Sequence, residues 1–129
     1  MKSMTVTPPS DKRIAQLIDA NLDRAREGLR VMEDWCRFGL KKNDLSVQIK
    51  NWRQQLGFHH HNIYRKERLT SKDPAMGVSH PLQKVRPSPE AVFIANSSRV
   101  QEALRVIEEF TRITDPKLCE IAANIRYET

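Results

Sequence analysis

The sequence predicts an all-α protein: a four-helix bundle made from a duplicated helical hairpin, with a long central loop between the two copies. Three observations predict this fold. Four segments repeat apolar residues with helical spacing, the second half of the chain repeats the first, and residues 69–87 interrupt the pattern with proline-containing turns. The chain has 129 residues, enough for one hydrophobic core. We therefore expect residues 1–129 to form a single helical domain.

Each predicted helix begins at a residue whose side chain can accept hydrogen bonds from the first free backbone amides. Ser88 and Asp115 are each followed by proline, which is favoured at the first helical position. The first helix is expected to end at Gly39, the second to fray near Gly57 and end around residues 65–68, and the third to end at about Ile113. The fourth is expected to run to the end of the chain. The candidate capping residues in chain order are Ser10 or Asp11, Asn43 or Asp44, Ser88, and Asp115.

The second half of the chain repeats the first. Residues 20–37 align on residues 95–112 without gaps, and the match includes polar as well as apolar residues. The repeated polar residues are Asn21 and Asn96, Arg24 and Arg99, Glu27 and Glu102, Arg30 and Arg105, Glu33 and Glu108, Arg37 and Arg112 and, after a two-residue shift, Asn51 and Asn124, and Arg53 and Arg126. A helical hairpin has been duplicated, so we expect the copies to be related by a pseudo-two-fold rotation.

A helical wheel places the repeated polar residues of the first helix on different faces. Asn21 falls on the centre of the apolar stripe, and Arg24 lies at its margin. Arg30, Glu33 and Arg37 lie on the opposite side, which we expect to face solvent. Polar groups inside a core need partners, because an unpaired buried amide or guanidinium is costly. Asn21 and Arg24 therefore require an explanation.

Two explanations fit these positions. In the structural one, Asn21 and Asn96 hydrogen-bond across the bundle, while Arg24 and Arg99 each pair with the glutamate three positions further on. In the functional one, the four residues converge on one cleft, within a protomer or across a homodimer, where the arginines bind phosphate bidentately. The sequence leaves both explanations open.

The segment 69–87 is predicted to be a long loop, because Pro74, Pro81 and Pro87 interrupt helical structure. Loops of this length in a compact domain are often functional. The charged residues here combine phosphate-binding cations with one carboxylate able to hold Mg²⁺, although a solvated basic loop is an equal alternative. These residues are Arg68, Lys72, Asp73, His80 and Arg86.

Two further groups of residues are interpreted as structural. Three consecutive histidines, His59, His60 and His61, point in different directions on a helix and cannot chelate a metal as an i, i+4 pair does, so we expect them at the surface or at a helix end. Trp35 and Trp52 fall on apolar stripes and are expected in the core.

The composition excludes several classes of protein. The chain has 22 Lys and Arg against 16 Asp and Glu, a net charge of +6 that favours anionic ligands. It has 4 glycines and no Walker sequence, so a glycine loop does not bind phosphate. The longest apolar run, residues 91–95, is too short to cross a membrane. Cys36 and Cys119 show neither disulfide nor zinc spacing. We expect a soluble, cytoplasmic protein with free thiols and no membrane partner.

Two stretches carry a resemblance to a known family: ANLDRAREGLRVMEDWCRF at residues 20–38 and IANSSRVQEALRVIEEFTRI at residues 94–113. With them, essentially the whole chain resembles the small bacterial hydroxymethylpyrimidine-phosphate kinases, whose domain occurs alone or fused ahead of thiamine-phosphate synthase. The loop is similar through Arg68, Asp73, the Ser79-His80-Pro81 triplet and Arg86.

The resemblance implies transfer of the γ-phosphoryl group of ATP, with Mg²⁺, to 4-amino-5-hydroxymethyl-2-methylpyrimidine phosphate, giving the diphosphate used in thiamine biosynthesis. Such a reaction needs charge neutralisation and alignment more than covalent catalysis. We expect the arginines to hold phosphates, the asparagines to orient the pyrimidine or a phosphate, and Asp73, or else Glu27 or Glu102, to hold Mg²⁺. The expected catalytic residues are Arg24, Arg99 and Asp73, and the expected substrate-binding residues are Asn21, Asn96, Arg68, Arg86, Glu27, Glu102 and His80.

Three rival interpretations remain. A chorismate-mutase-like enzyme is suggested by residues 13–19, but the duplication argues against it. A nucleic-acid-binding module would suit the basic charge, but the chain contains no recognisable recognition helix. The third is a non-catalytic helical domain attached to a thiamine-phosphate synthase. Residues 126–129 still have a helical pattern, so we expect that the chain is an excised N-terminal domain of such a fusion or a standalone protein.

Overall fold

The computed structural model describes residues 11–68 and 87–129, and within these residues it contains helices and no strand. The elements are α1 (Lys12–Asp34), a π-helical turn η2 (Trp35–Gly39), α2 (Asn43–Phe58), the short helix α3 (Asn62–Arg65), α4 (Pro89–Thr111) and α5 (Pro116–Glu128). No helix in this part of the chain is long and apolar enough to cross a membrane. The predicted all-α class is confirmed.

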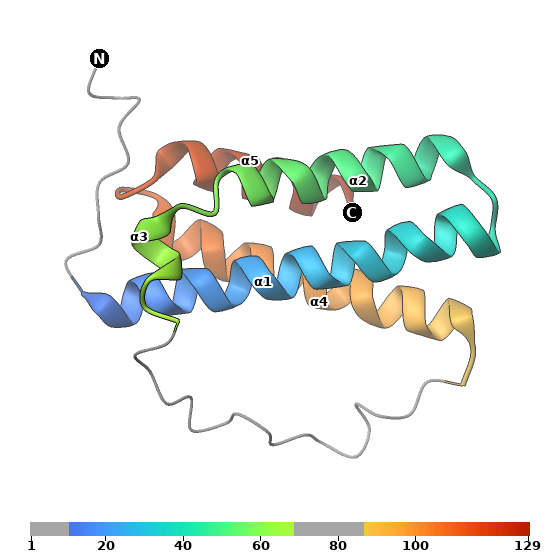
Figure 1. Cartoon of the computed structure of the whole chain (residues 1–129), viewed down its shortest axis with the longest axis horizontal. Coiled ribbons are helices and arrows are strands. Elements are labelled where there is room, and N and C mark those ends of the chain that lie inside the picture. Colours follow the sequence, from blue (N-terminus) through green and yellow to red (C-terminus); the bar gives the residue numbers. More distant parts are fainter. Residues whose placement is uncertain (1–10, 69–86) are drawn as a thin grey trace.

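The four long helices form a bundle (Figure 1). Helices α1 and α4 pack against each other along the centre, α2 packs on α1, and α5 packs on α4, so that the bundle consists of two hairpins. The predicted four-helix bundle of duplicated hairpins is therefore confirmed. The predicted connecting loop, apart from residue 87, lies outside the described residues.

Three of the four long helices begin at the capping residues that the sequence predicts. Oδ1 of Asp11 accepts a hydrogen bond from the Arg13 amide over 2.8 Å, and Oγ of Ser88 accepts one from the Ala91 amide over 3.1 Å. Oδ1 of Asp115 caps α5 in the same way. These bonds satisfy amides that have no partner inside the helix.

Helix α2 departs from the prediction at both ends. Asn43 is its first helical residue, and Lys42 precedes it without a side-chain cap. Lys41 makes the preceding turn with a φ of 56°. At the other end, α2 stops at Phe58 and the chain turns before α3 begins. The predicted end at residues 65–68 is wrong, because α2 ends at Phe58, next to Gly57 where fraying is expected, and residues 62–65 form the separate helix α3.

The core lies between the two hairpins and consists of aliphatic residues from all four long helices together with Tyr64 of α3. Trp52 packs against this core as expected, and Trp35 is half-buried in the η2 turn. Helices α1 and α4 approach each other closely at Gly28, where a Cβ atom would lie 2.6 Å from Cγ2 of Val100. Only a residue without a side chain fits here.

Candidate functional site

A shallow, open pocket of about 400 Å³ lies on the seam between α1 and α4; it is called the cavity beside Asn21 below. This volume is at the small end of the range for ligand pockets and suits a compact molecule such as a single substituted ring. Two of the predicted site residues, Asn21 and Arg24, line it. Its other lining residues are Arg13, Gln16, Leu17, Ala20 and Val106. The cavity therefore combines guanidinium groups, amides and an apolar wall in one place.

Asn21 is buried and bonded to its own helix, whereas the side chain of Arg24 is exposed. Nδ2 of Asn21 donates to the carbonyl of Leu17 over 2.9 Å, and the residue is only 5% exposed. Nη1 of Arg24 donates to Oδ1 of Asn21 over 3.5 Å, a long hydrogen bond, and the side chain of Arg24 is exposed. Most of its donors remain available to an anion.

In the second copy, Asn96 lies elsewhere on the same seam and Arg99 is exposed. Nδ2 of Asn96 donates to its own helix, at the carbonyl of Val92, over 2.9 Å. Its Oδ1 would be 3.8 Å from a Cβ at Gly28. Gly28 is seven positions from Asn21, or about 10 Å along the helix axis. The cavity beside Asn21 is lined by neither Asn96 nor Arg99.

The structural explanation of these residues is wrong in its details. Both asparagines bond carbonyls of their own helix, four positions back, and not each other. Glu27 and Glu102 are exposed, and among the described residues neither forms the expected pair with Arg24 or Arg99. The outward position of these side chains explains this, since water solvates them without a partner.

Glu33 and Glu108 lie in buried ion pairs and not on the solvent side, which corrects the wheel-based prediction. Nε of Arg53 donates to Oε1 of Glu33 over 2.8 Å, and Nη2 of Arg126 donates to Oε1 of Glu108 over 3.1 Å. The two glutamates are 5% and 4% exposed. Each pair joins the two helices of one hairpin. The recurrence of all four residues is therefore explained by packing, and it shows that the copies have equivalent environments.

A second cluster, which the sequence did not predict, ties the turn after α2 to α1. Nε2 of His60 lies 2.6 Å from Oδ1 of Asp19, and Nη2 of Arg68 donates to the same oxygen over 2.7 Å. Nδ1 of His60 lies 3.3 Å from Nη1 of Arg26, so Nδ1 accepts and Nε2 donates. His60 lies just beyond the end of α2, as the helix-end alternative predicts, but it is only 4% exposed and so is not a surface residue.

The ionisation of this cluster follows from its surroundings. Burial lowers the pKa of His60, and its hydrogen bond to Asp19 only partly opposes this. Burial acts to raise the pKa of Asp19, but the hydrogen bonds from Arg68 and His60 outweigh it, so the pKa lies below its usual value. At neutral pH the cluster contains a carboxylate, a neutral imidazole and a guanidinium. Arg68 is thus engaged in an ion pair.

The first copy alone has this cluster. Asp19 and Asp23, which both contact Arg68, correspond to Ile94 and Ser98 in the second copy. This difference between otherwise similar copies is the feature of the sequence from which the cluster could have been predicted. Among residues 11–68 and 87–129, no group of three or more His, Cys, Asp or Glu could hold a metal ion. Asp73, His80 and Arg86 lie outside the described residues.

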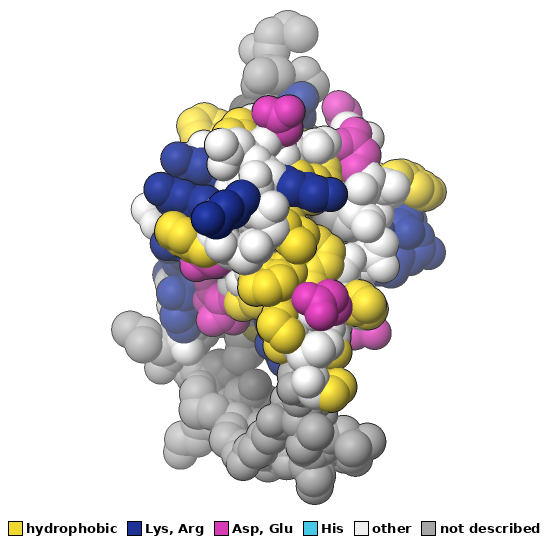
Figure 2. Space-filling view, turned by 90° about the vertical axis from the view of Figure 1, so that its right-hand side faces the viewer, with side chains coloured by type: hydrophobic (Ala, Val, Ile, Leu, Met, Phe, Trp, Pro, Cys, Tyr) yellow, Lys and Arg dark blue, Asp and Glu magenta, His cyan; other side chains and the backbone are white. Residues whose placement is uncertain are grey.

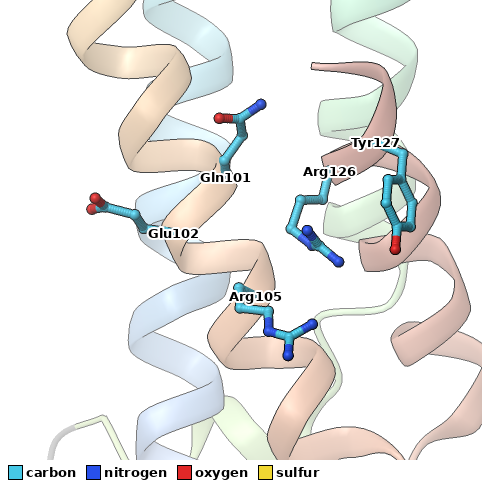
Figure 3. A pocket seen from close by; sticks show the side chains of 5 residues that line it. All are labelled: Gln101, Glu102, Arg105, Arg126 and Tyr127. Atoms are coloured by element: carbon cyan, nitrogen blue, oxygen red, sulfur yellow. The ribbon is translucent and has the colours of Figure 1, made fainter.

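A larger but equally shallow surface pocket, of about 610 Å³, lies between α4 and α5 (Figure 3) and is called the cavity between α4 and α5 below. Its lining residues are Gln101, Glu102, Arg105, Arg126 and Tyr127. Gln101 and Arg105 project from α4 toward α5, whereas Glu102 points away from it. Arg105 already pairs with Glu109 over 2.6 Å, and Arg126 pairs with Glu108. Its cations are therefore less available to a phosphate than Arg24.

The fold and the cavity beside Asn21 define a duplicated helical domain with a small polar pocket. The chain belongs to the ThiD2 family, whose sequence model matches residues 16–129. It is 62% identical to a thiamine-phosphate synthase of Prochlorococcus marinus (strain SARG) over 97% of this chain and 36% of that protein. The corresponding protein of strain MIT 9303 is also 62% identical, over 98% and 36%.

A thiamine-phosphate synthase of Synechococcus sp. (strain WH7803) is 61% identical over 98% of this chain and 36% of its own length. The chain therefore spans about a third of the length of these curated relatives. No solved structure matches the chain. The predicted resemblance to a family associated with thiamine-phosphate synthase is confirmed.

Proposed function

We propose that this chain is a helical domain of a thiamine-biosynthetic protein of the thiamine-phosphate synthase type. The supporting observation is the 62% identity that extends over 97% of this chain but only 36% of the relative. The synthase reaction then belongs to the remaining part of such a protein. The buried ion pairs and the tightly packed seam suit a domain that acts as a stable support.

Deletion in the intact relative tests this proposal. Removing the region that matches residues 16–129 from the protein of strain SARG should leave synthesis of thiamine phosphate measurable in vitro. The same deletion should impair growth without thiamine in a strain that depends on this protein. Complete loss of synthase turnover in a folded deletion variant would show that the helical region belongs to the synthase active site.

A second candidate function is phosphorylation of hydroxymethylpyrimidine phosphate, favoured by the pocket beside Asn21. The ring would lie against the apolar wall, Asn21 would orient it, and Arg24 would bind its phosphate. In the reaction an oxygen of that phosphate forms a bond to the γ-phosphorus of ATP, and the bond from the γ-phosphorus to ADP breaks. Mg²⁺ would neutralise the developing charge, held by Asp73 or by Glu27 or Glu102.

Of the two loop-associated arginines proposed to bind phosphate, Arg86 is the better candidate, because Arg68 already pairs with Asp19 and Asp23. A direct assay tests the kinase. The 129-residue chain is incubated with the pyrimidine monophosphate, ATP and Mg²⁺, and the diphosphate and ADP are measured by mass spectrometry. If neither product forms, the kinase proposal fails, while the domain proposal is judged by the deletion experiment.

A further inference from the structure

The two copies of the hairpin differ in what covers them. In the first copy the turn after α2 and the helix α3 pack on α1 and bury Asp19, which is 3% exposed. His60, on this turn, has a fully buried side chain. In the second copy the residue equivalent to Asp19 is Ile94, and it is 65% exposed. A large aliphatic side chain thus lies open at a position that the other copy covers.

The exposed face of α4 continues from Ile94 along one side of the helix. Ser98, Gln101 and Arg105 follow at positions i+4, i+7 and i+11, so the four residues form a stripe. At Gln101 and Arg105 this stripe forms one wall of the cavity between α4 and α5. Tyr127 lines the opposite side and is 78% exposed (Figure 3).

The residues that differ between the two copies also give the exposed face of α4 a different chemistry from the equivalent face of α1. Asp19, Asp23 and Arg26 of the first copy are charged and are matched by charged or polar residues of the chain itself. Their counterparts Ile94, Ser98 and Gln101 are uncharged. A partner that covers them gains from apolar contact and hydrogen bonds and needs no ion pair. The first turns of α4 lie at the end of the molecule that Figure 2 faces, where hydrophobic side chains gather in a band.

We infer that the stripe Ile94, Ser98, Gln101 and Arg105, together with Tyr127, is the docking surface for the remaining part of a synthase-type protein. This inference rests on the proposed function, in which the chain is one domain of a longer protein. The curated relatives are long enough to supply such a partner, since the matching region is 36% of their length. The partner packs on the second copy where α3 packs on the first.

Side-chain footprinting tests the inference on intact proteins. The 129-residue chain and the full-length relative of strain SARG are labelled with hydroxyl radicals, and the peptide that matches residues 94–101 is quantified in both. Its labelling should fall about fivefold or more in the full-length protein, because side chains at the centre of an interface lose nearly all contact with water. The peptide around Val47, which is 55% exposed on α2, is the control and should be labelled equally.

Equal labelling of the 94–101 peptide in both proteins would overturn the inference. Sedimentation of the isolated chain gives an independent check. If the chain is a dimer that Ile94→Glu dissociates, the occupant is a second copy and the inference is also overturned. Growth of the deletion strain without thiamine distinguishes failure of the docking surface from failure of the proposed function. If growth is impaired but the 94–101 peptide is not protected, only the docking surface is wrong. If growth is normal but the peptide is protected, only the proposed function is wrong.

Discussion

Arg53 and Glu33 hold the first hairpin together: Nε of Arg53 lies 2.8 Å from Oε1 of a glutamate that is almost fully buried. The pair links α2 to α1. A carboxylate in such a place is stable only while its cation is present, because it has been removed from water.

Replacing Arg53 by Ala should therefore destabilise the protein by about 3 kcal/mol, since it leaves the Glu33 carboxylate buried without a partner. Urea unfolding at pH 7 measures this. The control is Arg30→Ala, whose partner Asp34 lies 3.5 Å away at the surface and whose loss should cost about 0.5 kcal/mol or less. Replacing Glu33 and Arg53 together by Leu should recover most of the loss. Similar effects of Arg53→Ala and Arg30→Ala would contradict the assignment.

Gly28→Ala should destabilise the bundle by about 1–3 kcal/mol, although alanine favours helix more than glycine does. The added Cβ would lie 2.6 Å from Cγ2 of Val100 and 3.3 Å from the backbone oxygen of Asn96, so α1 and α4 must move apart. Gly57→Ala is the matched control, because its Cβ meets the end of the flexible Arg26 side chain at 3.2 Å. Thermal unfolding of both variants decides the matter, and a more stable Gly28→Ala protein would refute the close approach.

The free energy of unfolding should decrease as the pH falls from 7 toward 5. Burial lowers the pKa of His60 in the folded state, so the unfolded chain binds the proton more readily below its ordinary pKa of about 6.5. Stability is thus fully present above that pH and is lost on acidification. Urea titrations at several pH values measure the slope.

The variant His60→Gln should flatten most of this slope. A smaller slope should remain, because burial also lowers the pKa of His59. His59→Gln is therefore the comparison, and it should retain the larger part of the dependence. An unchanged slope in His60→Gln would show that His60 does not control stability in this pH range.

Arg24→Ala should reduce turnover about ten- to a hundredfold if the pocket binds the pyrimidine phosphate, which corresponds to the loss of one charge-assisted hydrogen bond of about 1.5–3 kcal/mol. Folding should hardly change, because the side chain is exposed. Arg99→Ala is the informative comparison, since Arg99 is the equivalent residue outside this cavity. Full kinase activity in folded Arg24→Ala protein would exclude the proposed phosphate contact.

The parts of the fold that depend on local sequence could be predicted, and the parts that depend on distant contacts could not. Caps such as Ser88, followed by proline, define helix starts without reference to the rest of the chain. Gly57 indicates only fraying at the break after Phe58, because the path of the following turn depends on His60 reaching Asp19, forty-one positions away in the chain. An interpretation from a helical wheel also assumes that charged side chains face water. This assumption placed Glu33 at the surface, whereas the residue is buried.

The candidate site was predictable to a similar degree. Asn21 and Arg24 are one turn apart, so their proximity follows from the helix itself. Whether Asn96 and Arg99 of the second copy lie beside them depends on how far α1 and α4 are shifted along each other. In an antiparallel pair related by a two-fold, equivalent residues meet only near the rotation axis, and the contact of Gly28 with Asn96 shows that the asparagines lie away from it.

Tyr64 of α3 donates its hydroxyl hydrogen to Oδ2 of Asp115 over 2.8 Å, while Oδ1 of the same carboxylate caps α5. One carboxylate thus serves a helix of the second copy and a tyrosine that follows the first. Opening either hairpin removes a partner that the other requires. The two halves of this duplicated chain should consequently unfold in a single cooperative transition, and gene duplication has here produced one folding unit instead of two.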